Sequence, residues 1–249
     1  MVKVSRTIVP SFFTVGNMFC GFYSIIAGIQ GNYYLAAWMI VAGAFLDAMD
    51  GKIARFTGSS SQFGVEYDSL ADVITFGLAP SMLIYVIFGK SMGIVGVFLS
   101  FLPLLFGSIR LARFNTKLKG FDKDYFSGLP IPIAAITITS FILFTLHFYG
   151  DPAKFPRVLI VMIFCVSILM VSNIRYETAP KMNFKGSKLD RTKFLLVIIG
   201  IIILIIYPDK SLFPMMLLYI LIGLIAWIFR LHKGQTNNNA EEVEIESEN

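Results

Sequence analysis

Long apolar runs, separated by short polar segments, recur along almost the whole chain. A run of about 18 apolar residues or more can cross a hydrocarbon core of about 30 Å as a helix. The expected spans are residues 12–29, 34–55, 70–88, 92–112, 132–149, 157–174, 194–207 and 212–231. We therefore predict an all-α polytopic membrane protein with about eight transmembrane helices, of which the seventh is the shortest.

Composition supports the membrane assignment and narrows the chemistry. Hydrophobic residues make up 56% of the chain and charged residues 15%, and the mean hydropathy is +0.72; soluble domains are about 45–50% apolar and about 25% charged. Cys20 and Cys165 both lie in apolar runs, and His147 and His232 are far apart in sequence. A disulfide framework and a Cys- or His-based metal site are therefore poor candidates. Any chemistry should rest on carboxylates and arginines.

The basic residues predict an orientation. With eight spans, 17 of the 21 Lys and Arg residues fall on the side of both termini, and only Lys90, Lys154, Arg157 and Lys210 fall on the other. By the positive-inside rule the 17-residue side is cytoplasmic. We predict a multi-pass protein of the cytoplasmic membrane with both termini in the cytoplasm, in contact with membrane lipids and with no nucleic-acid partner.

The last segment of the chain has a different composition. Residues 233–249 contain five glutamates and few apolar side chains, too few to bury a core. We predict an integral membrane domain over residues 1–232 and a disordered acidic cytoplasmic tail over residues 233–249.

Four aspartates stand at the facing ends of the second and third spans. Asp47 and Asp50 are three residues apart, and Asp68 and Asp72 are four apart, so each pair projects from one face of its helix. Because the polar TGSSSQ segment reverses the chain between them, the two helices present four carboxylates to each other. These charges repel unless cations lie between them. All-oxygen ligands favour a hard divalent cation, Mg²⁺ or Mn²⁺.

The residues around the aspartates indicate a phosphate ligand. Gly51 and Ala54 leave one helix surface bare and Gly64 does the same opposite, so a flat group such as a nucleotide base could approach the backbone. Arg55 lies at the same helix end, where a guanidinium can bind phosphate oxygens bidentately. Carboxylates, a divalent cation and an arginine together suggest phosphoryl-group chemistry.

These residues match a known signature. Asp47, Asp50, Gly51, Ala54, Arg55, Gly64, Asp68 and Asp72 reproduce the pattern D-x2-D-G-x2-A-R-x8-G-x3-D-x3-D. The chain thereby resembles the CDP-alcohol phosphotransferases, and PSFFTVGNMFCGF, DSLADVITFGLAPS, RLARFN and FSGLPIP resemble the bacterial and archaeal phosphatidylserine synthases among them. The resemblance covers about the first 135 residues, and it implies a six-helix family core followed by two further helices.

The resemblance also implies a reaction. Two divalent cations would bind Asp47, Asp50 and Asp68, with Asp72 completing the site and acting as general base. The phosphatidyl group of CDP-diacylglycerol would pass to the hydroxyl of L-serine, CMP would leave, and the protein would act as a homodimer. Asn17, Gly51, Ala54, Arg55 and Gly64 would bind the CDP-lipid.

The serine pocket has weaker candidates. Arg110, Arg113 and Asn115 could bind the serine carboxylate or the lipid phosphate, although RLARF could also be a positive-inside anchor. Gly128, Pro130 and Pro132 could shape the headgroup pocket or form only an interfacial turn. Asn17 could reach the nucleotide or form a structural hydrogen bond between helices.

There are three alternatives to this assignment. Within the family, the acceptor could be glycerol phosphate or inositol phosphate instead of serine. In another class, intramembrane carboxylates occur in cation-coupled transporters, but their ion sites lie near the bilayer midplane and the sequence shows no internal repeat. An inactive scaffold would be expected to have lost a signature residue.

Overall fold

The computed structural model describes residues 12–57, 62–118, 128–174, 176, 199–200 and 202–247, and side chains as far as Arg230. Within these ranges the regular structure is entirely helical, which confirms the all-α prediction. The elements are α1 Phe12–Ile29, α2 Tyr33–Thr57, α3 Gln62–Asp72, η2 Val73–Leu78, α4 Ala79–Ile87, η3 Gly89–Met92, α5 Gly93–Leu118, α6 Ile131–Tyr149, α7 Pro156–Val171 and α9 Pro208–Ser247.

Six helical stretches of the described chain are long and apolar enough to cross a membrane. They are Phe12–Ile29, Tyr33–Ile53, Gln62–Ile87, Gly89–Thr116, Ile131–Tyr149 and Pro208–Arg230. Helix α7 is apolar but has only 16 residues, about 24 Å at 1.5 Å per residue. Residues 194–198 and 201 of the predicted span 194–207 lie outside the described residues, and 199–200 and 202–206 are helical.

The boundaries differ from the predicted ones mainly in the third and last spans. The third begins at Gln62 instead of residue 70, because the polar turns that carry Asp68 continue directly into the apolar run as one helical stretch. Helix α9 continues to Ser247, through most of the tail that we expected to lack structure; the tail contains five Glu residues, and Glu favours helices. The division of the chain at residue 232 stays a prediction.

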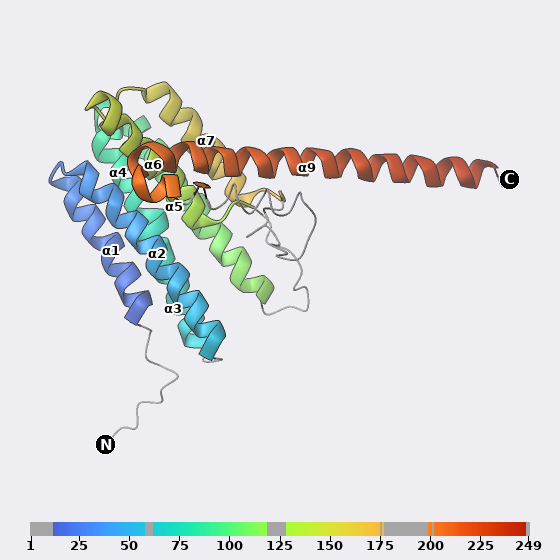
Figure 1. Ribbon diagram of the computed structural model, residues 1–249, viewed down its shortest axis with the longest axis horizontal. Helices are drawn as coiled ribbons and strands as arrows, with labels where there is room; N and C mark the ends of the chain where they lie inside the picture. The colour runs from blue at the N-terminus through green and yellow to red at the C-terminus, as the bar shows by residue number, and fades with distance from the viewer. Residues whose placement is uncertain are drawn as a thin grey trace, which may run out of the picture.

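A tight turn joins α1 to α2. Gly31 has a φ of +81° and donates to the Gly28 carbonyl, while Asn32 donates to the Ala27 carbonyl; a glycine in this conformation commonly ends a helix. The Asn32 side chain then accepts a hydrogen bond from the Leu35 backbone N–H, which caps the start of α2. The two helices are therefore antiparallel neighbours, as Figure 1 shows.

The third span contains a π-helical turn, η2, directly after Asp72. Pro80 follows it. Because proline has no backbone N–H, the series of i to i−4 hydrogen bonds of an α-helix is interrupted there. Thr75 of η2 is buried between α1 and α2, where two glycines make room for it: a Cβ on Gly21 or on Gly43 would lie 2.5 Å from the Thr75 side chain. Thr75 Oγ1 also donates to the Asn17 carbonyl. This packing fixes the position of the span close to Asp72.

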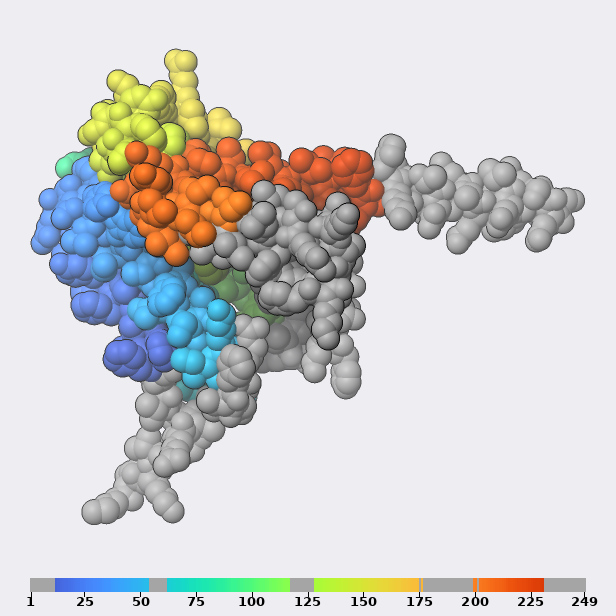
Figure 2. Space-filling model, viewed as in Figure 1, coloured from blue at the N-terminus to red at the C-terminus, as the bar shows by residue number. Residues whose placement is uncertain are grey.

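Helix α6 is the most buried of the spans, and it packs against α2, α7, η2 and α9. In the space-filling view, the orange first turns of α9 lie between the blue residues of α1 and α2 and the yellow-green residues of α6 (Figure 2). Gly150 ends α6 with a φ of +67° and donates to the Leu146 carbonyl. The α6 helix therefore supports both the third span and α9.

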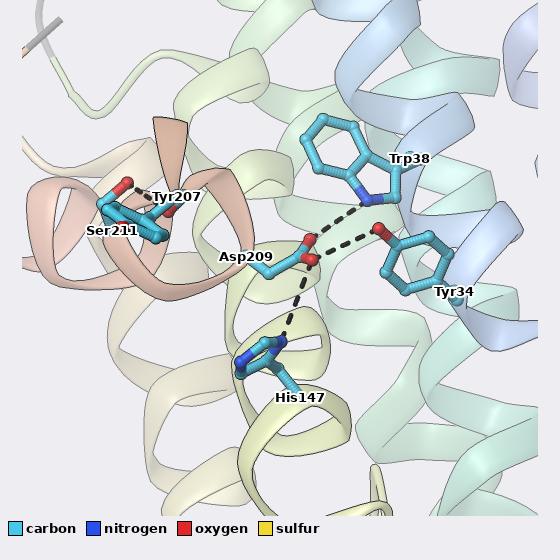
Figure 3. Close-up of polar contacts among 6 residues, drawn as sticks. All are labelled: Tyr34, Trp38, His147, Tyr207, Asp209 and Ser211. Carbon is cyan, nitrogen blue, oxygen red and sulfur yellow. Dashed lines mark hydrogen bonds and ion pairs between the residues drawn. The ribbon is translucent and has the colours of Figure 1, made fainter. Parts of the chain in front are cut away.

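Asp209 anchors the start of α9 to this part of the bundle. Its carboxylate accepts hydrogen bonds from Tyr34 Oη and Trp38 Nε1 of α2, both at 3.2 Å, and His147 Nδ1 of α6 lies 4.0 Å from it (Figure 3). A carboxylate in the first turn of a helix is also favoured by the helix dipole. From this anchor α9 runs across the bundle and extends away from it (Figure 1).

Candidate active site

Three of the four predicted aspartates converge where α2 faces α3. Carboxylate oxygens of Asp47, Asp68 and Asp72 lie within 4.8 Å of one another. Asp47 is six residues before Ile53 at the end of its apolar stretch, and Asp68 is six residues after Gln62 at the start of the next. In an antiparallel pair these positions are level, which explains why aspartates separated in sequence meet.

Asp50 lies beside this group without belonging to it. It interacts electrostatically with Asp47 and with Asp68, and its Oδ2 accepts a hydrogen bond from Thr14 Oγ1 of α1. Thr14 is buried and lies three residues before Asn17, on the same face of α1. Helix α1 therefore directs two polar side chains at the carboxylates.

Asn17 is the second of these side chains. It is completely buried, and its Nδ2 donates to Asp72 Oδ1 over 3.2 Å. Its own Oδ1, like Asp68 Oδ1, is buried without a hydrogen-bond partner in the described structure. Asn17 thus belongs to the carboxylate site and orients Asp72, and the site contains two buried oxygens whose hydrogen-bonding capacity the described structure does not use.

Arg110 of α5 also lies close to Asp72. Its side chain is 8% exposed and that of Asp72 is 9% exposed, and the two interact electrostatically. The Arg110 Nε is buried without a hydrogen-bond partner in the described structure. A buried guanidinium needs partners for its N–H groups, so this one is suited to an anionic ligand.

The donor set fits a hard divalent cation. All the candidate ligand atoms are carboxylate oxygens, and Asp68 offers a buried oxygen with no partner. Close carboxylates in a low-dielectric site require positive charge between them. Oxygen-only ligation suits Mg²⁺ or Mn²⁺ better than zinc.

The predicted CDP-lipid residues flank this cluster. Gly51 lies on the exposed surface of α2, and Gly64 is half-buried in the first turn of α3. The backbones of Ala54 and Arg55 lie in α2, but their side chains lie outside the described residues. Their nucleotide and phosphate roles stay predictions.

Among the serine-pocket candidates, Asn115 lies in a polar cluster between α3 and α5. Its Nδ2 donates to Ser69 Oγ over 3.0 Å and to Glu66 Oε2 over 3.2 Å. Arg113 instead points to the end of α7, where its Nη1 donates to the Val171 carbonyl over 2.8 Å. Asn115 therefore lies close to α3. Of the two candidate arginines, Arg110 lies beside Asp72 and Arg113 does not contact the carboxylates in the described structure.

Gly128 and Pro130 form a tightly packed loop. The Gly128 N–H donates to the Ile174 carbonyl over 2.9 Å. Its φ is +86°, and a Cβ there would lie 2.2 Å from the Met170 carbonyl oxygen, so only glycine fits. Pro130 immediately precedes α6, and Pro132 lies in its first turn. The loop joins the ends of α6 and α7, and its predicted part in the headgroup pocket stays a prediction.

Sequence reasoning missed several polar residues of the site. Thr14 could have been found, because a polar residue three positions from Asn17 shares its helix face. Glu66 and Ser69 precede residue 70, where the predicted third span begins. Thr75 has no sequence signal of its own, since its place depends on glycines in two other helices.

Comparisons with known proteins agree with the site. The family model described as CDP-alcohol phosphatidyltransferase matches residues 7–166. The chain is 38% identical to a CDP-diacylglycerol–serine O-phosphatidyltransferase of Helicobacter pylori, over 92% of this chain and 95% of the relative. It is 37% identical to an archaetidylserine synthase of Methanothermobacter thermautotrophicus, over 70% and 71% of the two chains. It is 33% identical to a CDP-diacylglycerol–serine O-phosphatidyltransferase of Bacillus subtilis, over 70% of this chain and 92% of the relative.

Proposed function

Because the chain belongs to the CDP-alcohol phosphatidyltransferase family, we propose that it transfers the phosphatidyl group of CDP-diacylglycerol to L-serine, forming phosphatidylserine and CMP. The observation that carries this function is the convergence of Asp47, Asp68 and Asp72, with Asn17 and Arg110 beside Asp72. The names of relatives that match almost the whole chain favour serine as the acceptor.

Asp47, Asp50, Asp68 and Asp72 would hold two Mg²⁺ or Mn²⁺ ions. When bound, such cations neutralise the diphosphate and stabilise the departing CMP. The hydrogen bond from Thr14 holds one oxygen of Asp50 and so limits the directions in which that carboxylate can face. The buried Asp68 Oδ1 has no hydrogen bond in the described structure, so it could bind a cation without breaking one.

Asp72 would act as the general base. Its carboxylate accepts the proton of the serine hydroxyl as the serine oxygen bonds to the phosphorus that carries diacylglycerol. The bond from that phosphorus to the bridging oxygen breaks, and CMP leaves with the electron pair. Asn17 holds Asp72 Oδ1, so the second oxygen can face the acceptor. Positioning is the main contribution of Asp72, because nearby cations weaken a carboxylate as a base.

The two substrates would approach Asp72 from different sides. The CDP-lipid would lie along α2 and the start of α3, where Gly51, Ala54, Arg55 and Gly64 follow one another around the carboxylates. Serine would lie on the α5 side, near Arg110 and the Asn115 cluster.

We further propose that the carboxylate end of the bundle faces the cytoplasm. Lys and Arg are concentrated on this side, and anionic lipids and the positive-inside rule favour that orientation. Both termini would then be cytoplasmic, and a homodimer is our proposal for the assembly from family resemblance.

The function is tested by supplying acceptors to the purified protein. CMP release from CDP-diacylglycerol should require serine together with Mg²⁺ or Mn²⁺, and labelled serine should appear in the lipid product. Glycerol phosphate and inositol phosphate, supplied separately, should release little CMP. CMP release with one of these acceptors and not with serine would show that the protein uses another acceptor alcohol. No release with any acceptor would refute the proposed transferase activity.

A further inference from the structure

Two buried hydrogen-bond donors near the candidate active site have no partner in the described structure. One is Nε of Arg110, in a side chain that is 8% exposed, and the other is the hydroxyl of Tyr176, in a side chain that is 5% exposed. An unsatisfied buried donor costs about 1–3 kcal/mol. A ligand that accepts from both would remove that cost.

Tyr219 of α9 connects these two residues. Its ring stacks on that of Tyr176, with centroids 5.9 Å apart and planes at 26°, and it interacts electrostatically with Arg110. Tyr176 also packs on Gly223, one turn further along α9, where a Cβ would lie 2.3 Å from the Tyr176 ring. Three segments of the chain therefore meet around one group of donors.

The anchor of α9 explains how Tyr219 reaches this position. Asp209 fixes the start of the helix to α2 and α6, and Tyr219 lies ten residues further, about 15 Å along the axis. Tyr219 and Gly223 share one helix face because they are four residues apart. These residues of α9 lie beyond the part of the chain that the family model matches, residues 7–166.

The chemistry of the group favours an oxyanion. A guanidinium carries a fixed positive charge and only donors, and each tyrosine hydroxyl can donate. Arg110 also interacts with Asp72, so the anion would lie beside the proposed base. In L-serine only two carbon atoms separate the hydroxyl oxygen from the carboxylate carbon, so a hydroxyl held at Asp72 brings its carboxylate close to Asp72 as well.

We propose that Arg110, Tyr176 and Tyr219 form the subsite for the carboxylate of the acceptor, so that α9 supplies a specificity-determining residue to the active site. This inference rests on the proposed transfer to serine. The phosphate of the CDP-lipid has the same oxyanion chemistry, but it would be held on the opposite side of Asp72, among the carboxylates of α2 and α3.

The test compares L-serine with serinol, an amino alcohol that lacks the carboxylate, in Tyr176→Phe and Tyr219→Phe variants. Each change removes only a hydroxyl. A hydrogen bond to a charged group is worth about 1.5–3 kcal/mol, so the preference for serine over serinol in kcat/KM should fall about tenfold or more. The fall should come from a higher KM for serine, with the KM for CDP-diacylglycerol unchanged. Tyr207→Phe, at an exposed position, is the matched control and should keep the wild-type preference.

The ratio of two acceptors in one preparation does not depend on the fraction of folded protein. An unchanged preference and an unchanged KM for serine in both variants would refute the subsite. A rise in the KM for CDP-diacylglycerol instead would assign the donors to the lipid phosphate and also refute it. If serinol turnover is too slow to measure, the two KM values decide in the same way. Wild-type protein that does not accept serine would overturn the proposed function itself.

Discussion

The side-chain amide of Asn17 donates a hydrogen bond to Asp72 Oδ1 over 3.2 Å, and so joins the first helix to the third across 55 positions of sequence. Both residues are buried. The bond holds one oxygen of the carboxylate on which the proposed proton transfer depends.

Replacing Asn17 with leucine, which has a similar size but no polar atoms, should therefore reduce turnover. A hydrogen bond to a charged group contributes about 1.5–3 kcal/mol, so we expect kcat to fall about ten- to a hundredfold. The matched control is Ser24→Ala, which removes another buried bond of α1, from Ser24 Oγ to the Ala36 carbonyl, and should keep most of the activity. Equal losses in both variants would assign Asn17 to helix packing alone.

Removal of divalent cations should abolish activity, because the clustered carboxylates need charge compensation and offer only oxygen ligands. The measurement is CMP release after exhaustive chelation, followed by addition of Mg²⁺ or Mn²⁺. Restored release shows that the protein stayed folded. Full activity in the chelated protein would contradict the metal site.

Arg55→Lys should impair catalysis although the charge is kept. An ammonium group cannot reproduce the planar two-point contact of a guanidinium with phosphate oxygens. The control is Lys52→Gln, which removes a whole charge from the same end of α2 and should affect turnover less. If the Arg55→Lys enzyme turns over like the wild type, Arg55 is only a membrane anchor.

Reporter accessibility should follow the distribution of basic residues. Reporters inserted after Gln30 or Lys90 should lie outside the membrane, and those after Ser59 or Lys119 should lie inside. Inverted accessibility at any of the four positions would remove a span from the proposed topology or reverse it.

Some parts of this structure are visible in the sequence because they depend on local patterns. Helices α1 and α6 match their predicted spans to within one residue, since turns and prolines limit the apolar runs. The polar stretch from Gln62 to Ser69 gives no such signal, so the predicted span begins eight residues too late, although the spacing of Asp68 and Asp72 already indicates a helix there.

The candidate site likewise has one part that the sequence predicts and another that only the structure reveals. The four aspartates have helical spacing within each pair, which is a property of the sequence. The subsite around Arg110 brings together Tyr176 and Tyr219, 43 positions apart, through the packing of a tyrosine ring on Gly223. In the sequence alone these tyrosines are ordinary aromatic residues near membrane spans, so only the tertiary structure identifies them.

The most direct test of the central claim measures labelled serine in the lipid product beside CMP release, in the wild type and in Asp47→Asn, Asp50→Asn, Asp68→Asn and Asp72→Asn. Wild-type protein should form one phosphatidylserine for each CMP. Asp72→Asn cannot accept the proton, so its turnover should fall about 10²–10⁴-fold, while metal and CDP-diacylglycerol binding survive better than in the other three variants. Normal turnover by Asp72→Asn would contradict the mechanism, and loss of metal equal to that of the other variants would make Asp72 a ligand and leave the base unassigned.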